Sequence, residues 1–270
     1  MGVDEHTIEV AGAAVFYHSA SWNGDPALYL HGIPCSGDAW RQSLARTGGI
    51  APDLPGFGRS SKAAHLNYSL AGQSELLERL LAALGLERVA LIAHGWGAGA
   101  ALVFAQRHPE AVRRLVLCNA LPLLDGWRWD RVARMLRTPG LGELLMGATT
   151  RSLLARQLRR GCARASAWPE GAIDAVWEQF DFGTQRAILR LLRDGDESRL
   201  AAAGARLHAL RMPALVIWGE LDPWLGPELA DAYGTRLAHA EVHRIARAGH
   251  WPWLDEPDVL DLIAAFLAAT

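Results

Sequence analysis

The most informative segment of this 270-residue sequence is Val89-Ala90-Leu91-Ile92-Ala93-His94-Gly95-Trp96-Gly97-Ala98-Gly99. Its first five residues form an apolar run that is too short for a helix, which favours a buried β-strand. The glycines from Gly95 onward predict a tight turn, and the Ala-rich residues 100–106 that follow are typical of a helix. A strand, a tight turn and a helix in this order form the context of a nucleophile elbow.

Short apolar runs continue on both sides of this segment. Residues 7–20 alternate and break at Ala11-Gly12, which predicts a β-hairpin. Further strands are expected at residues 27–30, 49–54, 115–118, 214–218 and 242–245. Helices are expected at residues 69–84, with Ser69 as the N-cap, and at residues 259–267. Because strands and helices alternate, we expect an α/β fold with a mostly parallel, doubly wound sheet.

The middle of the chain has a different pattern. Residues 121–200 contain helix-like segments rich in Arg, Leu and Trp, and no stretch in this block resembles a strand. Strands resume only after it. We therefore expect one sheet domain built from residues 1–120 and 201–270, with residues 121–200 inserted as a helical cap.

Composition restricts the partners of the chain. A net charge of −2 without blocks of like charge argues against nucleic acid and against a membrane surface. Cys35, Cys118 and Cys162 have spacings that suit neither a disulfide framework nor a zinc site. The first ten residues lack the apolar region of a secretory signal. We expect a soluble cytoplasmic protein, monomeric or homodimeric, that needs no cofactor or metal and acts on a small apolar molecule.

Five motifs, in order, resemble those of the α/β-hydrolase superfamily, specifically its epoxide hydrolase and haloalkane dehalogenase branch. They are His31-Gly32-Ile33-Pro34, Asp53-Leu54-Pro55-Gly56-Phe57-Gly58-Arg59-Ser60, Ala93-His94-Gly95-Trp96-Gly97-Ala98, Trp218-Gly219-Glu220-Leu221-Asp222 and Gly249-His250-Trp251-Pro252. The resemblance extends along the chain from end to end. It implies an α/β-hydrolase fold with a mostly parallel sheet of about eight strands, flanked by helices and carrying an inserted helical cap.

The resemblance also shows what is missing from the elbow. In that branch the motif resembles Gly-His-Asp-Trp-Gly with Asp as the nucleophile, and esterase relatives have Ser there. Gly95 has no side chain and forms no covalent intermediate. Three interpretations stay open: a native chemistry that needs no nucleophile, a covalent hydrolase inactivated or engineered at residue 95, and a ligand-binding protein without turnover.

The other catalytic positions are filled. The resemblance implies that Asp222 is the acid and His250 the base, and that the backbone N–H groups of Ile33 and Trp96 form an oxyanion hole. Asn119 lies where some relatives carry an alternative acid; as an amide it lacks that role, and we expect a polar loop residue. We therefore predict noncovalent general-base catalysis by His250, oriented by Asp222, in a hydrolysis, elimination, cyclisation or isomerisation.

A substrate pocket is expected around these groups. Its candidate lining is His31, Gly32, Pro34, His94, Trp127, Trp129, Trp224 and Trp251. Dehalogenases of the family often carry Asn where this chain has Ile33, and epoxide hydrolases use cap tyrosines, whereas all four tyrosines here lie outside the cap. Cys35 could act as a displaced nucleophile, but we expect a buried thiol there. Asp181 in the cap could act as an acid, but we expect a solvated charge.

Overall fold

The computed structural model describes residues 2–269 and contains an eight-stranded sheet in the order β1-β2-β4-β3-β5-β6-β7-β8. The strands are β1 Asp4–Val10, β2 Ala13–Ala20, β3 Ala27–Leu30, β4 Gly49–Pro52, β5 Val89–His94, β6 Val112–Ala120, β7 Ala214–Gly219 and β8 Ala240–Ile245. Strand β2 pairs antiparallel with both of its neighbours, and every other pairing is parallel. The predicted mostly parallel sheet of about eight strands is confirmed.

Burial explains why the central strands are continuously apolar. Every residue of β3, β5 and β7 is buried, because helices cover both faces of the sheet. At the edge, β1 and β2 form the predicted hairpin. Its turn residues Ala11 and Gly12 have φ angles of 54° and 77°, and two successive left-handed residues make the turn that fits the twist of a hairpin.

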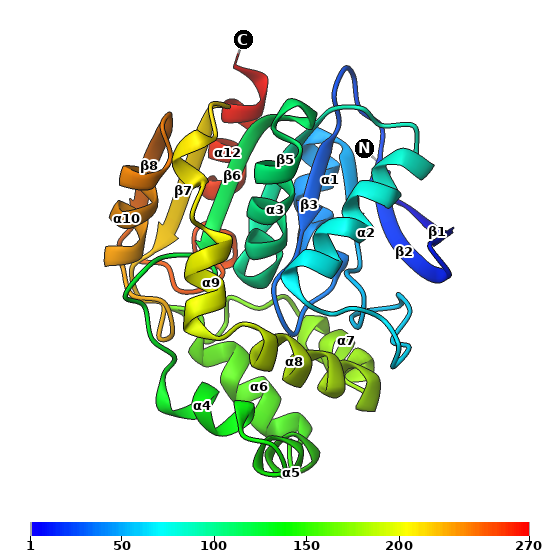
Figure 1. Cartoon of the computed structure of the whole chain (residues 1–270), viewed down its shortest axis with the longest axis vertical. Coiled ribbons are helices and arrows are strands. Elements are labelled where there is room, and N and C mark those ends of the chain that lie inside the picture. Colours follow the sequence, from blue (N-terminus) through cyan, green and yellow to red (C-terminus); the bar gives the residue numbers. More distant parts are fainter. Residues whose placement is uncertain (1, 270) are drawn as a thin grey trace.

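Helices pack on both sides of the sheet (Figure 1). In this view α2 (Leu70–Ala83) and α3 (Gly95–Arg107) lie in front of the strands, and α1 (Arg41–Thr47) and α12 (Asp258–Ala268) lie behind them. The Ser69 hydroxyl accepts a hydrogen bond from Gly72 N at 3.1 Å, which confirms the predicted N-cap of α2. Two further helices are α10 Glu228–Arg236 and α11 Pro252–Asp255, and 3₁₀ turns lie at Gly37–Trp40, Pro109–Ala111 and Leu207–Ala209.

A run of helices separates β6 from β7. It comprises α4 Arg131–Arg137, α5 Leu141–Gly147, α6 Arg151–Arg160, α7 Ala172–Gln179, α8 Phe182–Asp194 and α9 Glu197–Ala203. Figure 1 shows α4 to α8 gathered at one end of the sheet, away from the layers that flank it. We call residues 121–200 the helical segment. Within the described part of the chain, no helix is both long and apolar enough to cross a bilayer.

Among the elements that are longer than the sequence pattern predicted, two have extensions that bear on the site. Helix α3 begins at Gly95 rather than at residue 100, so the elbow glycine is already its first residue. Strand β6 covers Val112–Ala120 rather than residues 115–118, and it therefore includes Asn119. The expectation that Asn119 is a polar loop residue was wrong: its side chain is completely buried.

Candidate active site

Gly95 stands at the junction of β5 and α3 in a left-handed conformation, with φ of 51°. Its carbonyl accepts a hydrogen bond from Leu121 N at 3.0 Å, which ties the junction to the end of β6. A Cβ built on Gly95 would lie 3.5 Å from Gly32 Cα and 3.7 Å from His250 Nε2. These are ordinary van der Waals distances, so the elbow position faces His250 and has room for a side chain.

The structure brings together the side chains of His250 and Asp222, the residues predicted as base and acid. Asp222 follows β7 and His250 follows β8 along the chain, and their side chains meet with His250 Nδ1 at 2.6 Å from Asp222 Oδ2. The other carboxylate oxygen, Oδ1, accepts hydrogen bonds from the backbone N–H groups of Trp224 at 2.9 Å and Leu225 at 3.1 Å. An Nδ1–H that donates to a carboxylate leaves Nε2 as the acceptor. Nε2 of the imidazole therefore faces residue 95, in the orientation that a general base would need.

Asn119 holds the acid in place, a role that the sequence interpretation missed. Its Nδ2 donates to Asp222 Oδ2 at 2.8 Å and to the Gly219 carbonyl at 3.3 Å, and its Oδ1 accepts from Gly219 N at 2.9 Å. The amide thus connects the end of β6 to the loop that carries Asp222. A signal was present: Asn119 directly follows an apolar strand, and the carboxyl ends of parallel strands gather polar groups of a site.

The backbone of His250 is fixed on both sides. Its N–H donates to the carbonyl of Gly161 at 2.6 Å, and its carbonyl accepts from Nε2 of His94 at 2.8 Å. Burial, together with the neighbouring His250, holds the pKa of His94 well below its usual range, so His94 stays neutral. His94 was expected to line the pocket; its polar contact is instead with the His250 backbone.

Two backbone donors lie beside the elbow. The N–H groups of Ile33 and Trp96 donate to no other residue within 2–269, and the N–H of Trp96 belongs to the first turn of α3. The first turn of α3 touches the loop that carries Ile33, because a Cβ built on Gly97 would lie only 2.4 Å from the His31 carbonyl. This close approach needs glycine at that helix position. Unpaired N–H groups of a helix N-terminus favour developing negative charge.

The loop from residue 31 to 34 is held in place by the His31 side chain and approaches the elbow closely at Gly32. His31 is buried; its Nδ1 lies 2.9 Å from the Gly32 carbonyl, and its Nε2 accepts from Leu54 N at 2.9 Å. The ring therefore joins this loop to the backbone at Leu54. Gly32 approaches residue 95 through its Cα, and Pro34 follows Ile33 across a cis peptide bond.

Indole rings form the apolar surroundings. Trp224 and Trp251 place ring edges around the His250 imidazole, with centroids 5.0 and 4.8 Å away at interplanar angles of 88° and 86°. On the elbow side Trp96 stacks with Trp129 at 6.0 Å and 14°, and Trp127 meets Trp129 edge-on at 4.4 Å. Trp127 and Trp129 thus connect to the site through Trp96.

The two alternative catalytic groups have other roles. Burial raises the pKa of the Cys35 thiol to about 12, so the thiolate needed by a nucleophile is not formed near neutrality. Asp181 caps α8 by accepting from Thr184 N at 2.9 Å, and it pairs with Lys62 at 2.8 Å. Both side chains are accounted for by packing and capping.

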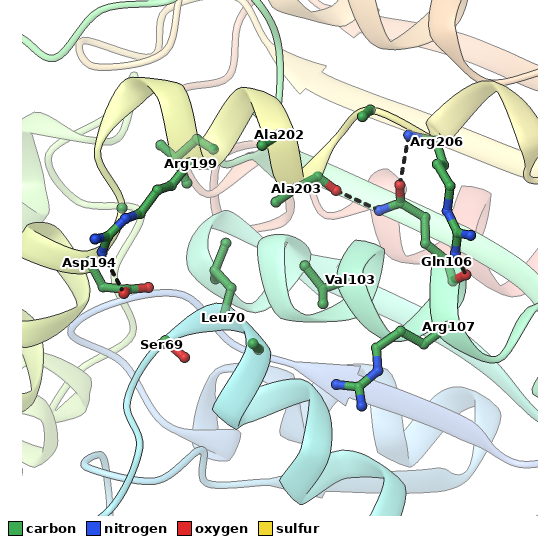
Figure 2. Close-up of a pocket in the computed structure, with 14 residues that line it drawn as sticks. Ser69, Leu70, Val103, Gln106, Arg107, Asp194, Arg199, Ala202, Ala203 and Arg206 are labelled. Carbon is green, nitrogen blue, oxygen red and sulfur yellow. Dashed lines mark hydrogen bonds and ion pairs between the residues drawn. The ribbon is translucent and has the colours of Figure 1, made fainter.

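A surface groove of about 640 Å³ lies elsewhere, between α2, α3 and α9 (Figure 2). Gln106 crosses it, donating to the Ala203 carbonyl at 2.8 Å and accepting from Arg206 N at 3.1 Å. The lining is Ser69, Leu70, Ala71, Val103, Gln106, Arg107, Asp194, Gly195, Arg199, Leu200, Ala202, Ala203, Ala205 and Arg206. None of the acid, base and elbow residues is among them, so we do not place the chemistry there.

Comparison with known proteins finds similarity over nearly the whole chain. The family model described as "alpha/beta hydrolase fold" matches residues 25–257. A haloalkane dehalogenase of Mesorhizobium japonicum is 28% identical, over 94% of this chain and 87% of the relative. A 2-hydroxymuconate semialdehyde hydrolase of Pseudomonas sp. is 30% identical, over 97% of this chain and 93% of the relative. The crystal structure of a haloalkane dehalogenase from Bradyrhizobium elkani superposes with a TM-score of 0.84 at 26% identity, covering 99% and 98% of the two chains.

Proposed function

The chain belongs to the α/β-hydrolase fold family, whose relatives named above are hydrolases, and we propose that it acts by noncovalent general-base catalysis on a small to medium apolar substrate. The observation that carries this proposal is the arrangement of His250. Its Nδ1 is bound to Asp222 at 2.6 Å, while its Nε2 is directed at an elbow residue that has no side chain.

In a hydrolysis, Nε2 of His250 removes a proton from a water molecule located beside Gly95. The water oxygen forms the new bond to the electrophilic carbon, and the proton held on Nε2 passes to the leaving group. Asp222 stabilises the imidazolium that exists between these transfers. The N–H groups of Ile33 and Trp96 supply donors for a developing oxyanion. The same base serves an elimination, a cyclisation or an isomerisation if the proton comes from the substrate.

The indole rings of Trp224 and Trp251 support an apolar substrate, since they pack large apolar surfaces against the base, and Trp96 directly follows the elbow residue. In this proposal residues 1–120 and 201–270 form the catalytic core and the helical segment acts as the cap over it. The turn after α6 supports that division, because the Gly161 carbonyl already contacts the backbone of His250.

A second candidate is a covalent hydrolase of the same family that lost its nucleophile at residue 95. The space around Gly95 favours it, because a Cβ there would touch neighbours only at 3.5 Å and beyond. The two candidates differ in what the present chain does. The noncovalent enzyme turns over a substrate with glycine at 95, and the inactivated hydrolase does not.

The test compares the unaltered chain with His250→Gln on a panel of aryl esters, haloalkanes and epoxides. General-base catalysis predicts turnover by the unaltered chain and a loss of about 10²- to 10⁴-fold in kcat/KM for His250→Gln. Intact-mass analysis during turnover should find no covalent adduct on the protein. A panel that binds, by quenching of tryptophan fluorescence, but is never converted would contradict the proposal and would fit either the inactivated hydrolase or a binding protein.

A further inference from the structure

Asp255, five residues after His250, is a buried carboxylate that the proposed mechanism does not use. Its side chain is completely buried and accepts three backbone hydrogen bonds. Oδ2 accepts from Ala163 N at 2.8 Å and from Gly249 N at 2.9 Å, and Oδ1 accepts from Arg164 N at 3.0 Å. The guanidinium of Arg164 also donates to the backbone carbonyl of Asp255.

These donors come from two parts of the chain that are far apart in sequence. Gly249 directly precedes His250, whereas Ala163 and Arg164 belong to the helical segment, just after α6. We call the loop between β8 and α11, which carries Gly249 and His250, the base loop. One carboxylate therefore joins the base loop to the helical segment. Charge-assisted bonds of this kind are stronger than those between neutral groups.

The same turn of the helical segment also holds His250 directly. The Gly161 carbonyl accepts from His250 N at 2.6 Å, two residues before the first Asp255 contact. The backbones are in close contact, because a Cβ built on Gly249 would lie 2.2 Å from the Gly161 carbonyl oxygen. Residues 161–164 and the base loop thus form one joint with Asp255 at its centre.

We propose that Asp255 is a positioning residue for His250: it clamps residues 163–164 of the helical segment onto Gly249, so the imidazole is aligned only while that segment is docked. The role of His250 as the base rests on the function proposed above, whereas the clamp itself does not. Asp255 acts through the backbone and touches no reacting atom.

The test variant is Asp255→Asn, which keeps the volume of the side chain but replaces one acceptor oxygen with an amide N–H₂. At least one of the three backbone N–H groups then meets a donor, which costs the hydrogen bond and adds an unsatisfied group. Glu256→Gln is the matched control, since Glu256 is the next residue along and pairs with Arg247 at 3.7 Å near the surface.

Three readouts separate positioning from a general loss of stability. The first is the proton NMR signal of His250 Nδ1–H, and the second is hydrogen exchange of the Gly249 amide relative to that of Leu91 in β5. The third is kcat and KM on any substrate that the unaltered chain converts. The first two need no turnover, so they test the clamp even if the proposed function fails.

For Asp255→Asn we expect a shifted or broadened Nδ1–H signal and Gly249 exchange about tenfold faster relative to Leu91. We also expect kcat to fall at least about tenfold with KM within about twofold. Glu256→Gln should change none of these readouts. If Asp255→Asn does not fold, Arg164→Ala, which removes the donor to the Asp255 carbonyl, should produce smaller changes in the same three readouts. An unchanged Nδ1–H signal, or exchange that accelerates equally at Gly249 and Leu91, would overturn the proposal.

Discussion

Asn119 and His250 bind the same oxygen of Asp222: the Asn119 amide donates to Oδ2 at 2.8 Å, and His250 Nδ1 donates to it at 2.6 Å. Both backbone donors on the other oxygen come from the loop just after Asp222. The acid is therefore oriented from two strands, with β6 supplying the amide and β7 the loop. An asparagine suits this position because it donates to a carboxylate that must stay charged.

Asn119→Ala should destabilise the protein and weaken the base. The substitution leaves the Gly219 N–H without its acceptor and removes one donor from Asp222, and each buried polar group left unsatisfied costs about 1–3 kcal/mol. We expect a loss of roughly 2–4 kcal/mol in the free energy of unfolding by urea denaturation. Asn67→Ala, which alters an exposed asparagine, is the control and should cost less than about 1 kcal/mol. Equal losses for the two variants would contradict the role of Asn119.

The sequence motifs singled out His250 and Asp222, whose side chains meet in the structure, but missed the residues that hold these two in place. The motifs predict the positions of both residues because each lies just past the end of an expected strand, and the strands themselves have a clear apolar pattern. Asn119 was misjudged because its strand continued two residues past the apolar run. Asp255 gave one overlooked signal, an acid directly after the apolar run Trp251-Pro252-Trp253-Leu254. Its partners at 163 and 164 are far away in sequence, and no local pattern predicts such a contact.

Stability should fall in mild acid because of buried neutral histidines. Burial lowers the pKa of His94 and of His31 in the folded protein, whereas an unfolded histidine titrates near about 6.5. Below that pH the unfolded chain binds protons that the folded chain does not, so their contribution is complete above about pH 6.5 and declines as the pH falls. Each histidine contributes a slope of at most about 1.4 kcal/mol per pH unit.

His94→Gln tests this pH dependence. Glutamine keeps an N–H₂ donor for the His250 carbonyl but takes up no proton, so the slope of unfolding free energy between about pH 4.5 and 6.5 should become shallower. Urea denaturation at several pH values measures it. His65→Gln, an exposed position, serves as the control and should leave the slope unchanged. A slope that is the same in His94→Gln and the unaltered chain would show that His94 is already protonated when folded.

Gly161→Ala should separate the helical segment from the base loop. A Cβ at residue 161 would lie 2.3 Å from the Trp251 ring and 2.7 Å from the Trp224 ring, and both rings are held by their neighbours. Overpacking of this kind typically costs about 1–3 kcal/mol. We expect that loss together with a lower kcat, because the Gly161 carbonyl also binds His250 N.

Gly147→Ala is the matched control for this substitution. Gly147 is the last residue of α5, and a Cβ there would meet nothing within 4 Å. Alanine favours helix by up to about 1 kcal/mol over glycine, so the melting temperature should stay the same or rise slightly. If Gly161→Ala melted like Gly147→Ala and kept its kcat, the close contact between the helical segment and Trp251 would be disproved.

Local sequence patterns predict some elements of the fold and miss others for physical reasons. Buried parallel strands are apolar throughout, and turns need glycine, so the positions of the strands along the chain and the hairpin at Ala11-Gly12 follow from local patterns. The start of α3 at Gly95 was missed because glycine is a weak helix former, and only the tertiary contact of Gly97 with the His31 loop explains it.

The most direct test of noncovalent catalysis is kcat/KM of the unaltered chain measured beside Gly95→Asp, Gly95→Ser and Gly95→Asp/His250→Gln on one substrate panel. Loss of a nucleophile from a covalent triad costs about 10⁶ in kcat in the subtilisin example. Our account predicts that the unaltered chain is the most active of the four, because a side chain at 95 displaces the water or substrate that His250 activates. An inert unaltered chain and a gain of several orders of magnitude in Gly95→Asp or Gly95→Ser, lost again in Gly95→Asp/His250→Gln, would contradict it.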